Sequence, residues 1–392
     1  MSKAPYRFML RALIAGSPFL VFVLAAELFL YLSGETVLLS TIAERHPRSG
    51  PPASYMTMLI SQQFDRLHFE RIRRERPEIL VLGSSHVTRF RKEMFAPRTD
   101  FYNCGRTIAC VGDLEEFVQA LPDGYAPKSV LLGIDHWWFN TSYSEPATFA
   151  EGIKTEESME PNAHFYAFKK LLQTLIHGRF EADVYKRIFS RQHDGLRRYG
   201  VLAWHSSGIR NDGSNQVYNR TTPPEFVDKL PQTLEEIGLR PEPCFIQGMK
   251  VDEALLTRFL KAIKALEQRG TLVVCFLTPL SSGLRDLYSQ YSTQFGIWFD
   301  YTKRVPETLE ENGVRCIDGS NPAVFGLDDR CLIDRDHARE TYGVALLREA
   351  AKNPQLRATL HLDLEQLESL LSDPRTTPLF PYFPSSDSSS PQ

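Results

Sequence analysis

Short apolar runs alternate with helix-like segments along two stretches of this chain, and this alternation constrains its fold more than any other feature. Strands that alternate with helices predict an α/β fold, in which a mainly parallel sheet carries helices on both faces. Five runs have the length and apolar content of buried strands. They are Ile79–Leu82, Phe101–Cys104, Ser129–Ile134, Thr271–Leu277 and Val314–Ile317.

The segments between these runs have apolar residues at helical spacing. Asp113–Leu121 is amphipathic, with Asp113 as its expected N-cap. Val251–Arg269 stops at Gly270, which is a good signal for the end of a helix. Two further helices are expected at Tyr301–Glu311 and Ala338–Ala351.

The N-terminus carries an apolar stretch, residues 12–32, that is long enough to cross a bilayer as one helix. Lys3, Arg7 and Arg11 precede it, so the positive-inside rule places residues 1–11 in the cytoplasm and the main domain outside. A cleaved signal peptide is the alternative. Its apolar region would be shorter and would end at small residues, whereas large residues (Leu28–Tyr31) end this one. Glu27 inside the span either snorkels to the outer interface, is protonated, or contacts a membrane partner.

The rest of the chain divides by composition. Residues 33–76 form a connector with a charged, helix-like stretch at Leu59–Arg76. Residues 141–250 are rich in polar and turn residues and are expected to form an insertion or cap, with a helical piece at Phe165–His177. The α/β domain then comprises residues 77–140 and 251–351. Residues 372–392, rich in Pro and Ser, are expected to be a disordered tail.

Charge and cysteine content exclude several classes of function. Lys and Arg number 45 against 48 Asp and Glu, so no basic excess points to nucleic acid. The six cysteines form no C-x-x-C pair and no metal-ligand spacing with histidine, so neither a metal nor a cofactor is implied. In an oxidising compartment Cys104 with Cys110, or Cys316 with Cys331, are the pairs that could form.

The first candidate for chemistry is Ser85, in the sequence Gly-Ser-Ser-His directly after the first predicted strand. The loops at the carboxyl ends of parallel strands host the sites of α/β sheets. A serine at the start of the next helix would expose its hydroxyl beside backbone N–H groups that can stabilise an oxyanion. The alternative is an ordinary turn and helix cap.

The second candidate is Asp334-x-x-His337, after the last predicted strand. A nucleophilic serine needs a base, and the base needs an orienting carboxylate. One turn can present both groups towards one cleft. The same spacing occurs at Asp65 and His68, in the helix-like stretch before the sheet, and is interpreted there as a solvated helix face. The two motifs have the same spacing and are distinguished only by their positions in the predicted fold.

A serine after the first strand and Asp-x-x-His after the last resembles the SGNH (GDSL) hydrolase superfamily, over roughly residues 77–140 and 251–351. The resemblance implies a three-layer, flavodoxin-like domain. It also implies that Ser85 is the nucleophile, His337 the base and Asp334 its partner.

Gly105 and Asp135 fall where that family places its oxyanion-hole glycine and asparagine, and Ser84 replaces the aspartate of Gly-Asp-Ser. An ionised carboxylate cannot donate to an oxyanion. We therefore expect Asp135 to be held by hydrogen bonds or by a cation such as Arg106. The oxyanion would then rely on the amides of Ser85 and Gly105, and Asp135→Asn would keep or raise activity.

With its N-terminal anchor, the chain resembles the extracytoplasmic branch of that superfamily, the DltD and AlgJ/AlgX-type proteins. That likeness implies a serine acyltransferase or esterase at the periplasmic side of a bacterial inner membrane. It would act on O-acyl groups of an envelope glycan or lipid, beside a membrane-bound O-acyltransferase. Two alternatives stay open: a catalytically inactive scaffold of such an acyltransferase, and an α/β protein with an accidental Asp-x-x-His.

Three further features are weaker candidates. His136 and Trp137, with Trp138, follow the third strand and either line an acyl or sugar pocket or pack against the insertion. Arg335, like Arg339, either holds an anionic substrate group or is a solvated residue at the start of a helix. The segment 210–214 either binds a polar acceptor or forms a plain surface turn.

Overall fold

The structure is a computed structural model with an α/β domain at its centre. It describes residues 4–35, 37, 39–45, 47–48, 50, 52–57, 64–143, 147–154, 165–169, 171–173, 176, 182–190, 197–205, 207–217, 230–231, 233–240 and 242–372. Within the expected tail it therefore describes Ser372 alone, and the prediction for the remaining residues lies outside the described part.

Five parallel strands form the central sheet, in the order β3-β2-β4-β8-β9. They are β2 (Ile79–Gly83), β3 (Phe101–Gly105), β4 (Ser129–Ile134), β8 (Leu272–Leu277) and β9 (Arg315–Ile317). The predicted α/β class is confirmed, and each strand lies within one residue of its expected bounds. Because β2 lies between β3 and β4, the order of the strands reverses there. The loop after β2 is thus at the switch point where open α/β sheets place their sites.

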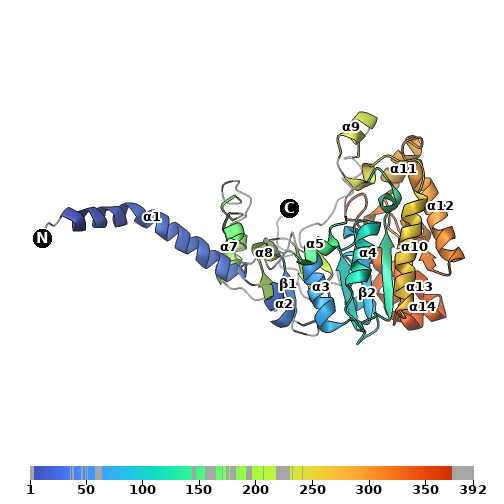
Figure 1. The fold of residues 1–392 in the computed structure, drawn as a ribbon, viewed down its shortest axis with the longest axis horizontal. Helices are drawn as coiled ribbons and strands as arrows, with labels where there is room; N and C mark the ends of the chain where they lie inside the picture. The colour runs from blue at the N-terminus through green and yellow to red at the C-terminus, as the bar shows by residue number, and fades with distance from the viewer. Residues whose placement is uncertain are drawn as a thin grey trace.

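Helices cover both faces of the sheet (Figure 1). One face packs on α3 (Phe64–Glu75), α4 (Val111–Ala120), α10 (Glu253–Gln268) and α12 (Gly296–Glu311). The other packs on α13 (Glu340–Ala351), α14 (Pro354–Thr359) and α15 (Leu364–Ser372). Successive strand residues serve opposite faces: Val130 and Leu132 enter the first core, and Leu131 enters the second. The remaining helix of this domain, α11, spans Ser282–Gln290.

Two local predictions around these helices are wrong. The N-cap of α4 is Cys110, not Asp113, whose carboxylate instead accepts hydrogen bonds from the amides of Thr148 and Phe149. His68 of α3 is buried, and its Nδ1 lies 3.0 Å from the hydroxyl of Tyr102. This face of α3 packs on the sheet and is not solvated.

A second, four-stranded sheet has the order β5-β1-β6-β7. Its strand β1 (Ala53–Tyr55) comes from the connector. The others, β5 (Arg197–Tyr199), β6 (Ser207–Arg210) and β7 (Asn215–Val217), come from the insertion. The turn between β6 and β7 is buried against the main sheet, where the Asn103 amide of β3 donates to the Asp212 carbonyl at 2.8 Å. Segment 210–214 is therefore not a surface turn: it covers the edge of the main sheet.

The N-terminal helix α1 (Ala4–Ser33) contains a window, Ala15–Ser33, that is long and apolar enough to cross a membrane. It projects from the body of the molecule (Figure 1), and the insertion helices α7 (Ala182–Ser190) and α8 (Val201–His205) pack near its C-terminal end. Three short helices, α2 (Leu39–Arg45), α5 (Phe149–Lys154) and α9 (Leu234–Gly238), complete the elements used below.

All six cysteines lie in the described part of the chain and all are free, so neither pair considered in the sequence is formed.

Candidate active site

Ser85 lies in the turn that follows β2. The chain forms a single 3₁₀ turn, Ser85–Val87, in place of the expected start of a longer helix. Gly83 enters this turn with φ +149°, and a Cβ there would approach the carbonyl oxygen of Gly133 to 2.9 Å. Glycine is required because the turn packs directly against β4.

His337 and Asp334 meet Ser85 in one hydrogen-bonded line. The Oγ of Ser85 lies 2.8 Å from Nε2 of His337, and Nδ1 of His337 lies 2.8 Å from Oδ1 of Asp334. The Asp334 carboxylate also accepts from the backbone amide of His337 at 2.8 Å. A bridge between Leu332 and Ala338 closes the loop that carries both residues, just before α13. The proximity expected from sequence is present.

The site is open to solvent on one side. The side chain of His337 is 34% exposed and that of Asp334 is 20% exposed. A substrate can therefore reach the base without a change of fold.

A second carboxylate, to which the sequence analysis gave no role, lies beside the same histidine. Oδ1 of Asp336 is 2.9 Å from Nδ1 of His337, and this side chain is only 8% exposed. Asp334 meets the geometry of a hydrogen bond to Nδ1, whereas Asp336 contributes a close ionic contact. Burial disfavours a charged imidazole, but the two carboxylates outweigh it and raise the pKa of His337 above its usual value.

His86 forms a buried ion pair behind the triad, and the sequence analysis gave it no role either. Its Nδ1 lies 2.8 Å from Oδ1 of Asp135, which also accepts from the Thr278 hydroxyl at 2.7 Å. Its Nε2 lies 3.8 Å from Oδ2 of Asp336. Burial opposes the charged imidazole, but the carboxylates of Asp135 and Asp336 overcome it and raise the pKa of His86 to about 10.

Asp135 is therefore held as expected by hydrogen bonds, but its cation is His86 and not Arg106. The guanidinium of Arg106 lies instead over the ring of Phe64, 4.2 Å from its centroid. The side chain of Asp135 is fully buried. The result is a continuous chain of ionisable groups, Asp135–His86–Asp336–His337, that ends at the Ser85 hydroxyl.

Gly105 does not provide the expected oxyanion donor. Its amide donates to Oδ1 of Asn103 at 2.7 Å, and Asn103 in turn donates to the carbonyls of Val87 and Phe90. These bonds attach strand β3 to the loop in which Ser85 lies. The amide of Ser85 has no acceptor among the described residues and remains available for an oxyanion.

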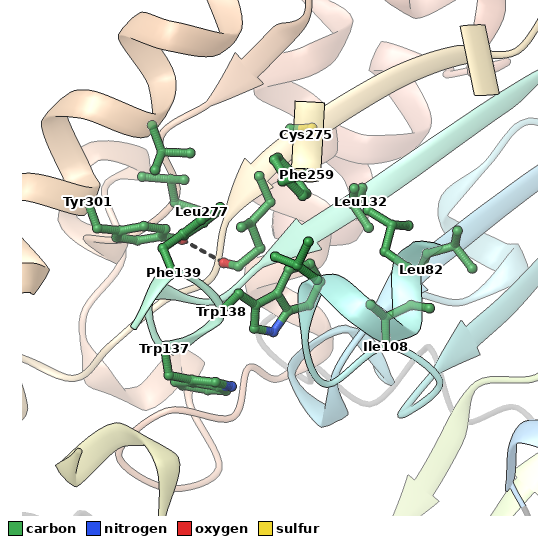
Figure 2. Packing of buried hydrophobic residues seen from close by; sticks show 14 of the residues in the cluster. Leu82, Ile108, Leu132, Trp137, Trp138, Phe139, Phe259, Cys275, Leu277 and Tyr301 are labelled. Carbon is green, nitrogen blue, oxygen red and sulfur yellow. Dashed lines mark hydrogen bonds between the residues drawn. The ribbon is translucent and has the colours of Figure 1, made fainter. Parts of the chain in front are cut away.

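His136 and Trp137 are core residues and not the lining of an open pocket. Figure 2 shows Trp137, Trp138 and Phe139 among the buried side chains beside the sheet. His136 is surrounded by rings, including those of Trp298 and Tyr288, and burial lowers its pKa to about 4. Trp137 meets the ring of His86 edge-on, with centroids 5.3 Å apart, so it packs behind the site.

Arg335 lies at the rim of the site against the insertion. Its guanidinium is 5.0 Å from the ring centroid of Phe245, and it lies 3.5 Å from a carboxylate oxygen of Glu242. Arg335 is thus engaged with the insertion and is not a fully solvated residue. With 25% of its side chain exposed, it can still meet a ligand.

The ligating atoms of His86, Asp336 and His337 lie within 4.8 Å of one another, a spacing that a metal ion also requires. The chemistry of these groups fits a proton network better. The Nδ1 of His86 is already hydrogen-bonded to the carboxylate of Asp135 at 2.8 Å. The Nε2 of His337 is committed to Ser85.

Comparison with known proteins identifies no relative: no family model matches the chain, and no curated protein sequence matches it.

The two site residues that could not be assigned from the sequence are His86 and Asp336. Each is adjacent in the chain to a residue that was assigned. The site is therefore defined by its geometry: an accessible Ser-His-Asp line with a buried His-Asp pair behind it.

Proposed function

We propose that this chain is a serine acyltransferase or ester hydrolase that works through Ser85, His337 and Asp334. The observation that carries the proposal is the 2.8 Å contact between the Ser85 hydroxyl and Nε2 of His337, at the switch point of the sheet. A base at this distance can accept the hydroxyl proton as the oxygen attacks an acyl carbonyl.

The reaction then proceeds in two halves. Ser85 Oγ bonds to the acyl carbon, and His337 delivers the proton to the departing alcohol. His337 then takes a proton from an incoming hydroxyl, whose oxygen bonds to the acyl carbon; the bond from that carbon to Ser85 Oγ breaks, and His337 returns the proton to Ser85 Oγ. Water at this step gives hydrolysis, and an acceptor hydroxyl gives acyl transfer. Asp334 fixes the tautomer of His337, and both carboxylates stabilise its charged form.

The location and the acceptor belong to the same proposal. Arg7 and Arg11 precede the span in α1, so the N-terminus is cytoplasmic and the α/β domain extracytoplasmic. The resemblance to envelope-acylating SGNH proteins favours a bacterial inner membrane. It also favours an envelope glycan or lipid as acceptor and a membrane-bound O-acyltransferase as partner. Alkaline phosphatase fused after residue 40 is expected to be active; an inactive fusion would contradict this orientation.

A fluorescent fluorophosphonate tests the nucleophile, because it reacts with activated serines. The full-length chain in detergent is expected to be labelled, and Ser85→Ala to lose the label completely. Ser289→Ala, which removes an exposed serine on α11, is the matched control and should label normally. Labelling that survives in Ser85→Ala would place the reactive serine elsewhere.

A non-catalytic scaffold for a membrane acyltransferase is the second candidate. The engagement of the Gly105 amide with Asn103 favours it, since this removes one expected oxyanion donor. The same experiment separates the two functions. A folded wild-type chain that takes up no fluorophosphonate is the result expected of the scaffold.

A further inference from the structure

The insertion carries large apolar side chains on its surface, close to the membrane helix. Phe165 is 70% exposed, Ile176 74%, Phe189 53% and Leu172 36%. We call these four residues the lobe patch. Several large, exposed apolar side chains in one part of a chain can mark an interaction surface.

The same part of the insertion packs directly on α1. Ala26, Phe29 and Leu30 of α1 are buried in one apolar cluster with residues of the insertion. Those residues are Ala167, Leu171, Val184, Ile188, Val201 and Trp204. Phe189 of the lobe patch reaches the membrane helix itself, since its ring lies 6.0 Å from that of Phe29. Phe189 therefore adjoins the surface of the membrane span. Ala167 and Leu171, which lie close in sequence to the other three residues of the patch, pack on the same helix.

The positions of these contacts fix the depth of the insertion. The span Ala15–Ser33 has 19 residues, about 28 Å of helix, which barely matches a hydrocarbon core of about 30 Å. Phe29 and Ala26 lie four and seven residues before Ser33, about 6 Å and about 10 Å inside the end of the span. Sliding the helix outwards by the four residues that separate Arg11 from Ala15, about 6 Å, brings Arg11 to the edge of the hydrocarbon, which limits the movement. Phe29 and Ala26 then lie between the outer edge of the hydrocarbon and about 10 Å inside it, so the residues that pack on them lie at the outer interface.

We propose that the lobe patch is embedded in the outer interface of the lipid bilayer, so that the insertion is a second membrane attachment beside α1. The depth of about 5–10 Å is that of helices that lie in the interface. Lys169 and Lys186 are exposed on the same helices, where long basic side chains can extend to lipid phosphates. The inference rests on the membrane crossing by α1 and is independent of the chemistry of Ser85.

Spin-label accessibility tests this in the full-length chain. The chain is reconstituted in vesicles of phosphatidylcholine and phosphatidylglycerol, with a nitroxide on Ile176→Cys or Phe189→Cys, after the two partly exposed cysteines, Cys110 and Cys316, are replaced by serine. Relaxation by oxygen, which concentrates in lipid, is compared with relaxation by an aqueous nickel chelate. Leu239→Cys is the matched control, because Leu239 is 79% exposed at the end of α9, far from α1 (Figure 1). Leu24→Cys, inside the span, reports the membrane crossing itself.

Positions 176 and 189 are expected to favour oxygen, as position 24 does, whereas position 239 favours the nickel chelate. If 176 and 189 behave like 239 while 24 lies in lipid, α1 crosses the membrane but the lobe patch does not enter it, and the proposal is wrong. Shielding of 176 and 189 that appears only in native membranes would assign the patch to a protein partner and would equally overturn it. A label at 24 that is accessible to nickel would remove the crossing on which the inference depends.

Discussion

The chain contains Asp-x-x-His twice, and the two copies differ in every property that matters for chemistry. His337 lies in a loop, bonds to Asp334 and Ser85, and has a raised pKa. His68 lies in α3 and meets the Tyr102 hydroxyl, and burial together with Arg71 and Arg106 lowers its pKa to about 3. Identical spacing has produced a partly exposed histidine that contacts a serine in one place and a buried core residue in the other.

The backbone conformation explains the difference. In a helix, residues three apart share a face but their side chains extend along it, and in α3 the ring of His68 meets Tyr102 and not Asp65. In the loop, Asp334 folds back and accepts from both the amide and the ring of His337. The neighbours differ too: Asp336 adds a negative charge at His337, whereas Arg71 adds a positive one at His68. Spacing is informative only once the local conformation is known.

The largest contrast is expected from removing each histidine. His337→Ala should lower the rate of fluorophosphonate labelling by up to about 10⁶-fold, because Ser85 loses its base. His68→Gln keeps a partner for Tyr102 and should label within a few-fold of wild type. The labelling rate constants measure both. Equal losses in the two variants would show that the two motifs do not differ in function.

Replacing the two carboxylates beside His337 tests the same contrast in a second way. Asp334→Asn should slow labelling by about 10²-fold, and Asp334→Asn with Asp336→Asn by about 10⁴-fold, the loss seen when a triad has no carboxylate. Wild-type labelling requires neutral His337, so its rate should fall as pH drops through the raised pKa of that residue. In Asp336→Asn this acid limb should move to lower pH. If the acid limb does not move, Asp336 does not influence the pKa of His337.

Asp135→Asn tests the buried pair behind the triad. The sequence alone predicts that this variant keeps or raises activity. The structure reverses the expectation, because Asp135 bonds His86 and Thr278. Without its charge, residue 135 binds His86 less strongly. Because His86 contacts Asp336 and Asp336 contacts His337, the orientation of His337 is weakened as well. A loss of up to about 10²-fold is expected in the labelling rate. Asp65→Asn, at the other motif, is the control and should have little effect.

Replacing His68 is expected to have the smallest effect on the labelling rate but a clear effect on the free energy of unfolding. Its pKa is about 3 in the fold and 6.5 in the unfolded chain, so the unfolded chain binds a proton that the fold excludes. Stability should therefore fall as pH drops from 6.5 towards 3, by several kcal/mol at most. The midpoint of urea unfolding measured against pH should show a smaller slope in His68→Gln. An unchanged slope would assign the acid sensitivity to other groups.

The sequence was sufficient for the sheet because each buried strand is a short apolar run between helices with clear periodicity. It also placed Ser85, Asp334 and His337 at one edge, since carboxyl ends of parallel strands converge. It could not place His86 or Asp336, whose roles depend on side-chain directions within a turn. It also missed the engagement of Gly105 with Asn103, and the burial of segment 210–214, because both depend on contacts between segments far apart in the chain.

The four-stranded sheet has a consequence for the order in which the molecule forms. Its strand β1 at Ala53–Tyr55 pairs with β5 and β6, which are made some 140 to 150 residues later. At about 5–20 residues per second, synthesis leaves β1 without partners for roughly 7 to 30 s after it emerges. The edge of β3 also stays bare until the β6–β7 turn arrives to bond Asn103. Unpaired strand edges are the groups that aggregate. The interval before residue 217 emerges is therefore when this protein most needs a chaperone.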